Sequence, residues 1–529
     1  MKAAIEKIFE LIERGELDNA YSKAFESINS GIKHPGIFTA LGIILCEKGH
    51  HQEAINYFLQ VINQDPLNAD VFNLLGVCYL RRDDFETAIV FFEKTLKIDP
   101  NHSDALANKA MALFRLSDFE GALSFFDKAI GVDSNFFEAF SSRGSVYKVM
   151  GLNEKALEDY DRSIEVNPNY ATAYFNKGNL YKDIKDHVNA IKNYDQALIL
   201  SPDYDDATWN KANTLLRIGR YIEGWKLYEI RWKIKFLKDS YRKYSQPMWT
   251  GKEVIKNKII FVFSEQGLGD VIQFSRYLSM LTDLGAEVIF ETPLALKALF
   301  QTLKGNIKLL SQGEALPKFD FYSPLMSLPL AFDTRIENIP SFDKYLSADK
   351  VKVEKWAKVL EPINGIRVGL VWSGGIRPFM EETTKVTQNK SIPLDKFSKL
   401  RDVDVSFISL QKGAQAEDEL KNLIKQRWNG PKVFDYSDEL KDFSDTAALI
   451  ENLDLVISVC TSVAHLSAAM GKRTWILIPY HACWRWLDDA SELSPWYPSV
   501  RLFRQSKAYE WENVIHEVCQ ELKKFTNIT

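Results

Sequence analysis

The chain has few cysteines, and they form no recognisable pattern. There are five in 529 residues, Cys46, Cys78, Cys460, Cys483 and Cys519, and no two stand in a C-x-x-C arrangement. Structural zinc sites and disulfide frameworks need paired cysteines at regular spacings, so the sequence suggests neither. This cysteine usage fits a reducing compartment best, and we expect the protein to lie in the cytoplasm.

An excess of one charge and long apolar runs are also missing. The 66 basic and 71 acidic residues are mixed along the whole length and leave a formal charge of -5. Such a mixture gives no electrostatic footprint for nucleic acid or anionic lipid. No apolar run approaches the roughly 20 residues that span a bilayer, and the first 20 residues resemble no signal peptide. We expect a soluble protein without a transmembrane segment or a nucleic-acid partner.

What the first half does have is a repeat of 34 residues, marked by small residues at Ala20, Ala54, Ala88, Ala122, Ala156, Ala190 and Gly224. A second set of small residues precedes five of these by twelve positions, at Gly42, Gly76, Ala110, Gly144 and Gly178. Aromatic residues follow by four positions, at Phe58, Phe92, Phe126, Tyr160, Tyr194 and Tyr228. This pattern predicts helix pairs in which a small residue faces an aromatic ring. Four prolines end the second helices, at Pro66, Pro100, Pro168 and Pro202.

The period and the marked positions resemble the tetratricopeptide (TPR) repeat, a helix-turn-helix unit, over residues 1–238. About seven repeats are predicted, and the first (1–34) and last (205–238) are degenerate, as capping repeats should be. Such solenoids present a groove to a peptide or another protein. The alternative is an array that serves only as a spacer for dimerisation or docking.

Asparagines recur at or next to one repeat position, at Asn73, Asn108, Asn176 and Asn210. Their side-chain amides could clamp the backbone of an extended peptide. They could equally form hydrogen bonds between neighbouring repeats, and the sequence does not decide between the two.

The second half alternates short apolar runs with amphipathic stretches, which predicts parallel sheets with crossover helices. The expected strands are 258–263, 287–292, 319–324, 367–372, 404–410, 432–436, 454–459 and 474–479. They fall into two groups, so we expect two doubly wound domains that face each other across a cleft. Ligands would bind beyond the carboxyl ends of the strands.

The segment "DLVISVCTSVAHLSAAMGK" is a buried strand that ends in small polar residues and starts a helix. Free amides at a helix N-terminus suit a diphosphate, and the hydroxyls of Thr461 and Ser462 would add donors near Ser458. His465 would lie one turn into this helix, where a lone histidine is more often structural.

Other polar residues also follow strands of this half. Lys390 precedes a Ser-Ile-Pro helix start, after a polar stretch that reads as a mobile loop, and could neutralise a phosphate. A solvated lysine is the alternative. Gln411, Lys412 and Glu417 would lie at the rim of the cleft, where they could read a nucleoside.

The turn "FSEQGLGDVIQF" follows the first strand and fits no nucleotide-binding motif. It lacks the G-K-[ST] end of a P-loop and the third glycine of the dinucleotide fingerprint. What it offers is Asp270 at a helix N-terminus, which suits a sugar hydroxyl or the proton of an attacking nucleophile. A helix cap is the competing explanation. Gln266, Gly267 and Gly269 would lie on the acceptor side.

Several motifs occur in the order seen in TPR-fused bacterial glycosyltransferases: "KIIFVFSEQGLGDVIQFSRYL", "VGLVWSGG", "NKSIPL", "SLQKG", "TSVAHLSAAMGK" and "WRWL...SPWYPSVRLFRQ". This half resembles a heptosyltransferase. The resemblance implies a GT-B fold of two Rossmann-like domains and an inverting, metal-independent enzyme with no cofactor. The donor is a nucleotide sugar and the acceptor a Ser or Thr hydroxyl of a protein captured by the repeats, as in fused members that resemble O-linked N-acetylglucosamine transferases and modify flagellin.

The resemblance also assigns roles and boundaries. It makes Asp270 the general base, Lys390 the cation beside the leaving diphosphate and His465 a third catalytic residue. It places Thr461 and Ser462 in the donor site. The predicted organisation is a TPR solenoid followed by an α/β module: repeats 1–238, linker 239–257, first domain 258–345, connector 346–365, second domain 366–510 and C-terminal helix 511–529.

One departure concerns Cys460, which stands where the family usually has Asp. A thiol cannot replace that charge at neutral pH unless its pKa is strongly lowered. The alternative function is therefore a TPR scaffold with a degenerate, non-catalytic second half. Transfer to a glycan or lipid is a third, less favoured reading, because the repeats indicate a protein acceptor.

Overall fold

The computed structural model describes residues 2–375, 389–426, 428–488 and 491–528. The predicted loop covers 373–388, and its residues 376–388 lie outside this part of the chain. The chain divides into two compact units, Met1–Tyr204 and Asp205–Thr529, which we describe separately.

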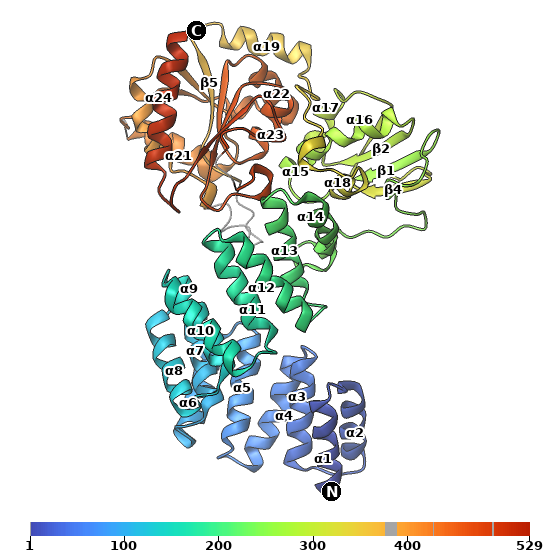
Figure 1. The fold of residues 1–529 in the computed structure, drawn as a ribbon, viewed down its shortest axis with the longest axis vertical. Coiled ribbons are helices and arrows are strands. Elements are labelled where there is room, and N and C mark those ends of the chain that lie inside the picture. The colour runs from blue at the N-terminus through green and yellow to red at the C-terminus, as the bar shows by residue number, and fades with distance from the viewer. Residues whose placement is uncertain (1, 376–388, 427, 489–490, 529) are drawn as a thin grey trace. The chain divides into compact units, whose positions relative to one another are not determined.

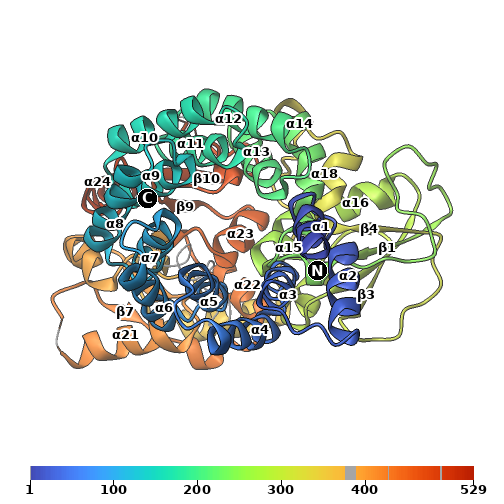
Figure 2. The ribbon, with the colours of Figure 1, turned by 90° about the horizontal axis from the view of Figure 1, so that it is seen from below.

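The first unit is a stack of helix pairs, and Figure 2 shows its helices in chain order from blue to teal. The helices are α1 (Lys2–Glu13), α2 (Leu17–Asn29), α3 (Pro35–Glu47), α4 (His51–Gln64), α5 (Ala69–Arg81), α6 (Phe85–Ile98), α7 (Ser103–Arg115), α8 (Phe119–Val132), α9 (Phe137–Val149), α10 (Asn153–Val166), α11 (Ala171–Asp183) and α12 (His187–Leu200). The second helix of four pairs ends two residues before a proline, as predicted.

The predicted contact between small and aromatic residues is confirmed. A Cβ atom added to Gly42 would lie 2.3 Å from the ring of Phe58, and one added to Gly76 would lie 2.4 Å from Phe92. Both rings are fully buried. Because no Cβ fits at either glycine, the small residue fixes how closely the two helices of a pair approach.

Ion pairs also repeat along the first unit. Lys109 contacts Glu93 at 2.7 Å and Arg143 contacts Asp127 at 2.6 Å, and Lys177 pairs with Asp161. In each case a first helix carries the cation and the second helix of the preceding repeat carries the carboxylate. The three cations are mostly buried, whereas their carboxylates are exposed, so we call this set the ion-pair column.

The second unit begins with α13 (Asp205–Arg217) and α14 (Tyr221–Tyr228), so the last predicted repeat belongs to it. The division between the two compact units thus lies one repeat before the predicted boundary at 238, which stays a prediction. Aromatic packing gives the reason: the Trp225 ring lies 5.1 Å from Trp484 and 6.2 Å from Phe274. This helix pair shares a core with the sheets rather than with the other repeats.

The first sheet has the strand order β3-β2-β1-β4, and all its pairs are parallel. Its strands are β1 (Ile259–Phe263), β2 (Glu287–Thr292), β3 (Ile307–Ser311) and β4 (Phe321–Pro324). Helices α15 (Leu268–Phe274), α16 (Arg276–Asp283) and α17 (Leu294–Phe300) cover one face (Figure 1). Trp232 and Tyr244, from the segment after α14, pack against the other face. The chain reverses direction across the sheet between β1 and β4, which is its topological switch point.

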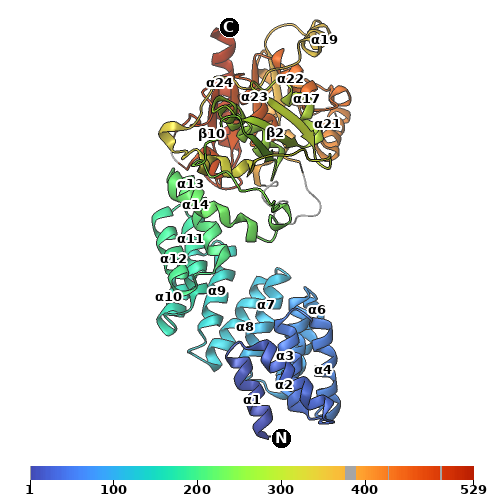
Figure 3. The ribbon, with the colours of Figure 1, turned by 90° about the vertical axis from the view of Figure 1, so that its right-hand side faces the viewer.

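The second sheet is also parallel, in the order β10-β9-β8-β5-β6-β7, with its switch point between β5 and β8. Its strands are β5 (Arg367–Val371), β6 (Ser406–Ser409), β7 (Val433–Phe434), β8 (Leu455–Val459), β9 (Thr474–Ile478) and β10 (Val500–Arg504). Alternate residues of the strands enter different cores. One core includes α21 (Ala414–Lys425) and α24 (Glu512–Ile528), which packs on β10 (Figure 3), and the other includes α22 (Phe443–Glu451) and α23 (Ser462–Ala469).

All eight expected strands are present, but two others were missed. The missed strands, β3 and β10, lie at the edges of their sheets. An edge strand is partly exposed and carries polar residues, here Lys308 in β3 and Arg501 and Arg504 in β10, which hide its apolar signal. The parallel sheets are consistent with the predicted α/β class. Helix α24 lies within the predicted C-terminal segment, and the predicted connector contains α19 (Lys350–Leu360).

Candidate functional site

The turns that follow β1 and β8 meet each other at their helix N-termini. A Cβ atom added to Gly269, on α15, would lie 3.0 Å from Cδ2 of His465 and 3.4 Å from Cα of Ser462, both on α23. Only a residue without a side chain allows this approach. The two switch points of the second unit therefore bring Asp270 and the start of α23 together.

The start of α23 has the properties of an anion site. Thr461 is the N-cap residue, but no side chain within the described residues caps the helix. Instead, the Thr461 hydroxyl lies 3.2 Å from the hydroxyl of Ser458, which is itself fully buried. The first amides of a helix have no partner within the helix, and its dipole favours negative charge there. The predicted positions of Ser458, Thr461 and Ser462 fit this arrangement.

Cys460 precedes this turn and is paired with a second thiol, Cys483. The indole Nε1 of Trp486 donates to Sγ of Cys460 at 3.0 Å. The hydrogen bond shared with Cys460, and to a lesser extent the charge of Arg485, lower the pKa of Cys483 to about 5. The same bond and burial raise the pKa of Cys460 well above its ordinary value. The shared bond thus shifts the two thiol pKa values in opposite directions, upward for Cys460 and downward for Cys483.

His465 is packed inside the protein, with 4% of its surface exposed. Its Nδ1 lies 3.0 Å from the hydroxyl of Tyr497, and its ring stacks on Trp486 at 5.2 Å. Burial, followed by the charges of Arg485, Arg276 and Lys390, lowers the pKa of His465 well below its ordinary value. The contacts of this buried imidazole hold α23 in position, and the catalytic role of His465 stays a prediction.

Asp270 makes two contacts across the meeting turns. One oxygen accepts a hydrogen bond from the Gly267 amide at 2.9 Å, which is the predicted helix cap. The other pairs with the guanidinium of Arg485. Burial alone would lower the pKa of Arg485, but the charges of Asp270, Cys483 and Tyr228 raise it above its ordinary value. The cap and the ion pair coexist, so the carboxylate is fixed in place beside α23.

Lys390 lies close enough to affect the same helix. Its charge lowers the pKa of both His465 and Cys460, in each case after larger effects. Arg485 acts on His465 in the same direction. Both cations thus act on residues at or near the start of α23, and the role of Lys390 beside a phosphate stays a prediction.

Gln411 differs from its predicted role. It is 3% exposed, its Oε1 accepts from the amide of Ser373 at 3.0 Å, and its Nε2 donates to the carbonyls of Ser373 and Lys412, both at 3.1 Å. The side chain is used to hold the turn after β5, so it cannot read a nucleoside. Lys412 donates to the carbonyl of Ser437 at 2.8 Å, and Glu417 accepts from the amide of Gly413 at 3.0 Å.

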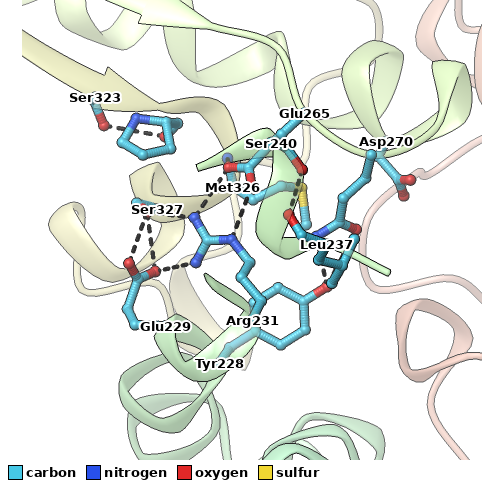
Figure 4. Close-up of polar contacts among 12 residues, drawn as sticks. Tyr228, Glu229, Arg231, Leu237, Ser240, Glu265, Asp270, Ser323, Met326 and Ser327 are labelled. Atoms are coloured by element: carbon cyan, nitrogen blue, oxygen red, sulfur yellow. Dashed lines mark hydrogen bonds and ion pairs between the residues drawn. The ribbon is translucent and has the colours of Figure 1, made fainter. Parts of the chain in front are cut away.

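A buried ion network supports the turn after β1 (Figure 4). Arg231 is fully buried, and its Nε and Nη2 donate to Glu265 at 2.9 and 3.0 Å. Nη2 also donates to Ser327 at 2.7 Å, while Glu265 accepts from the amide of Met326 at 3.0 Å. Burial alone would lower the pKa of Arg231, but Glu265 and Glu229 raise it above its ordinary value. The network joins the turns after β1 and β4.

The predicted acceptor-side residues lie in this supported turn. Gln266 has a φ of 64°, a backbone conformation that is uncommon outside glycine, and its side-chain amide donates to the Tyr228 hydroxyl at 3.1 Å. In Figure 4, Asp270 lies apart from the Arg231 network. The chain therefore uses Glu265 to hold the turn and leaves Asp270 for the site.

In the first unit, three of the predicted asparagines take part in hydrogen bonds between repeats. Nδ2 of Asn108 donates to Asn73 at 3.1 Å, and Nδ2 of Asn176 donates to the hydroxyl of Ser141 at 3.1 Å. This is one of the two predicted alternatives, and peptide binding by these residues stays a prediction. Asn210 lies in the second unit, so the four do not form one continuous row within the first.

The sequence reading missed Arg485, Cys483 and Arg231. Arg485 lies within "WRWL", a segment that contributes to the family resemblance but to no predicted site residue. The sequence pattern that could have indicated it is an arginine between two tryptophans, because a buried guanidinium can stack on an indole ring. In the structure, Cζ of Arg485 lies 4.2 Å from the centroid of the Trp484 ring. Within the described residues, no group of three or more His, Cys, Asp or Glu could hold a metal ion, and no helix there could cross a membrane.

Family models match the chain in its first unit. The model described as "Tetratricopeptide repeat" matches residues 69–102 and 171–204, a second with that description matches 91–124, and "TPR repeat" matches 150–185. The first unit is therefore a solenoid of tetratricopeptide repeats.

One curated relative matches this chain over a stretch that is longer than the first unit. Protein FlbA of Caulobacter vibrioides is 26% identical over 340 residues, which cover 59% of this chain and 54% of that protein. The chain thus spans about half the length of this relative.

Solved structures of repeat proteins are also similar to parts of the chain. A thermophilic TPR protein of Thermus thermophilus is 19% identical with a TM-score of 0.33, covering 35% of this chain and all of that one. A tetratricopeptide repeat protein of Parabacteroides merdae is 17% identical with a TM-score of 0.38, covering 45% of this chain and 94% of that one.

Proposed function

We propose that the second unit transfers a glycosyl group from a nucleotide sugar to a hydroxyl of a protein that the repeats capture. The observation that supports this most is the meeting of two different turns. One carries the carboxylate of Asp270, and the other carries the uncapped start of α23 with Lys390 and Arg485 nearby. A base and an anion site side by side are what transfer from a diphosphate requires.

The chemistry assigns one role to each turn. A Ser or Thr oxygen of the acceptor would bond to the anomeric carbon while the bond from that carbon to the diphosphate oxygen breaks. Asp270 would accept the proton of the hydroxyl. The leaving diphosphate carries the electron pair of the broken bond, and the amides of α23, Lys390 and Arg485 would stabilise its charge. Attack from the side opposite the leaving group inverts the anomeric centre. This scheme agrees with the metal-independent GT-B class that the motifs resemble.

The repeats supply the acceptor in this proposal. Tetratricopeptide arrays are protein-binding scaffolds, and the repeat models match the first unit. A flagellin-like protein is the acceptor that the resemblance suggests. His465 acts here as a positioning residue, because it is buried and neutral.

A second candidate function is a scaffold whose sheet unit does not catalyse. Cys460 favours it, because a neutral thiol stands where the resembling enzymes carry a carboxylate. Calorimetry with a panel of UDP, GDP, ADP and CMP sugars separates the two candidates. Absence of binding by every member would favour the scaffold.

The test of transfer is the intact mass of flagellin-like acceptors expressed with and without this protein. We expect a mass increase that names the sugar class. Asp270→Ala should reduce the rate of transfer by about 10²- to 10⁴-fold and Lys390→Ala by about 10²- to 10³-fold. Lys396→Ala, an exposed lysine that pairs with Glu512, is the control and should leave the rate unchanged. Near wild-type transfer by both site variants would refute the assigned roles.

A further inference from the structure

Arg485 is a cation that pairs with Asp270 and also interacts with the Cys483 thiol. Its side chain is 11% exposed and pairs through Nη2 with the Asp270 carboxylate, which is 20% exposed. Its Nε is buried and has no hydrogen-bond partner among the residues that the structure describes. The guanidinium can donate five hydrogen bonds in a fixed fork, so this ion pair does not use its capacity.

The ion pair conflicts with both functions that the site needs. One Asp270 oxygen is occupied by the guanidinium and the other by the Gly267 amide, so neither is open to the proton of an acceptor hydroxyl. An anion at the start of α23 would meet the negative charge of Asp270 across the turns, since Gly269 touches Ser462 and His465. Arg485 pairs with Asp270, and the adjacent residue, Trp486, stacks on His465 of α23, so Arg485 is placed to relieve both difficulties.

We propose that Arg485 exchanges partners during the reaction. In the free protein it neutralises Asp270, and when a diphosphate binds at the start of α23 the guanidinium moves its hydrogen bonds to the phosphate oxygens. Planar, bidentate contacts with phosphate are the contacts that arginine makes best. The carboxylate is thereby freed only after the donor is bound, which makes the donor bind before the acceptor reacts.

The catalytic consequence of the exchange rests on the proposed function, whereas the exchange itself concerns only binding. Asp270 and an anionic diphosphate should compete for the same guanidinium. A competition between two ligands for one group predicts that removing one strengthens binding of the other. The claim can therefore be tested with inorganic pyrophosphate and needs no knowledge of the sugar or the acceptor.

The experiment is a double-mutant cycle on the full chain, with pyrophosphate affinity measured by calorimetry at constant ionic strength. Asp270→Asn keeps an oxygen for the Gly267 amide and removes the charge, so it should tighten binding by about threefold to tenfold. Arg485→Gln should weaken binding by about tenfold or more. In the Arg485→Gln background, Asp270→Asn should lose most of its effect, because the contested guanidinium is gone.

Two controls guard the interpretation. Asp320→Asn removes the same charge at the opposite end of β1, where Asp320 accepts from the Ile259 amide at 2.8 Å, and should leave affinity unchanged. Arg485→Lys keeps the charge without the fork and should weaken binding less than Arg485→Gln does. If Arg485→Gln does not fold, as judged by circular dichroism, the Lys variant takes its place in the cycle.

Three results would overturn the proposal: no pyrophosphate binding by the wild type, unchanged or weaker binding by Asp270→Asn, or the same tightening in both Arg485 backgrounds. The last result would mean that the Asp270 charge repels pyrophosphate directly and does not compete with it for Arg485. If the cycle behaves as expected but no sugar is transferred to any acceptor, the proposed function fails and the exchange of partners stands. If sugar is transferred but the mutant cycle does not behave as expected, the proposed function stands and the exchange of partners is refuted.

Discussion

The two sheets of the second unit have equivalent switch points that are filled in different ways. Between β1 and β4 the crevice is occupied by the chain itself, because Arg231 is fully buried there with Glu265 and Ser327. Between β5 and β8 the turns lead to α23, which has no side-chain cap within the described residues. The same topology thus creates two possible ligand sites. Arg231, from the segment after the last repeat, fills the one between β1 and β4.

The difference shows what decides where a ligand can bind in such a fold. The first turn is acidic, with Glu265 and Asp270, and recruits cations of the protein. The second turn offers amides, hydroxyls and nearby cations, which recruit an anion from outside. The comparison can be tested at each turn, and three predictions follow in order of expected effect.

The largest effect is expected from opening the closed switch point. Arg231→Met would leave Glu265 buried without its partner, and breaking a buried pair on one side costs about 3 to 5 kcal/mol. The free energy of unfolding from denaturant titration measures the loss. Arg335→Met breaks the pair with Asp333, in which both side chains are more than half exposed, and should cost about 1 kcal/mol at most. Equal losses in the two variants would show that Arg231 does not close the crevice.

A smaller effect is expected from pushing the two turns apart. Gly269→Ala would place a Cβ atom 3.0 Å from the ring of His465, and overpacking of this kind costs about 1 to 3 kcal/mol. The free energy of unfolding should fall, and pyrophosphate affinity should change with it. In the matched control, Gly131→Ala, the new Cβ atom meets nothing within 4 Å, and the helix should gain about 1 kcal/mol. A neutral Gly269→Ala would mean that the turns are not in contact.

The smallest effect concerns the charge of the second turn. Because the pKa of His465 lies well below its ordinary value, the unfolded chain binds a proton at this residue before the folded protein does. Its contribution to stability is present above an unfolded pKa near 6.5 and is lost as pH falls below it, by about 0.7 kcal/mol between pH 7 and pH 6.

His465→Gln should therefore flatten the pH dependence of unfolding over this interval. The exposed His516 on α24 provides the comparison, and His516→Gln should leave the slope as it is in the wild type. A slope that His465→Gln does not change would contradict a neutral, buried imidazole.

Features that depend on near neighbours in the chain could be predicted from the sequence. The spacing of Gly42 and Phe58 gave the helix pairs, because both partners of the contact lie within one repeat. The β1 and β8 turns were found for the same reason, since an apolar strand followed by small polar residues is a local pattern. The strands of the sheet centres were also correct, whereas the polar edge strands β3 and β10 were missed.

The site itself depends on residues far apart in the sequence, and this is where prediction failed. Nothing near Asp270 indicates that Arg485 pairs with it, and nothing near Gln411 shows that both its amide atoms are used by the turn after β5. The burial of His465 likewise comes from Tyr497 and Trp486, on another segment. These contacts exist only once the two sheets have formed.

The ion-pair column carries a consequence for the evolution of chain length. Each cation pairs with the carboxylate sixteen residues before it, so inserting or deleting a whole repeat leaves every remaining partner at its proper separation. An insertion of any other length would separate the pairs that it interrupts. The array can therefore gain or lose reach in steps of one repeat, but only before residue 205, because the last repeat is built into the core of the sheets. A chain with more or fewer repeats could therefore bind a partner of a different size while its second unit stays unchanged.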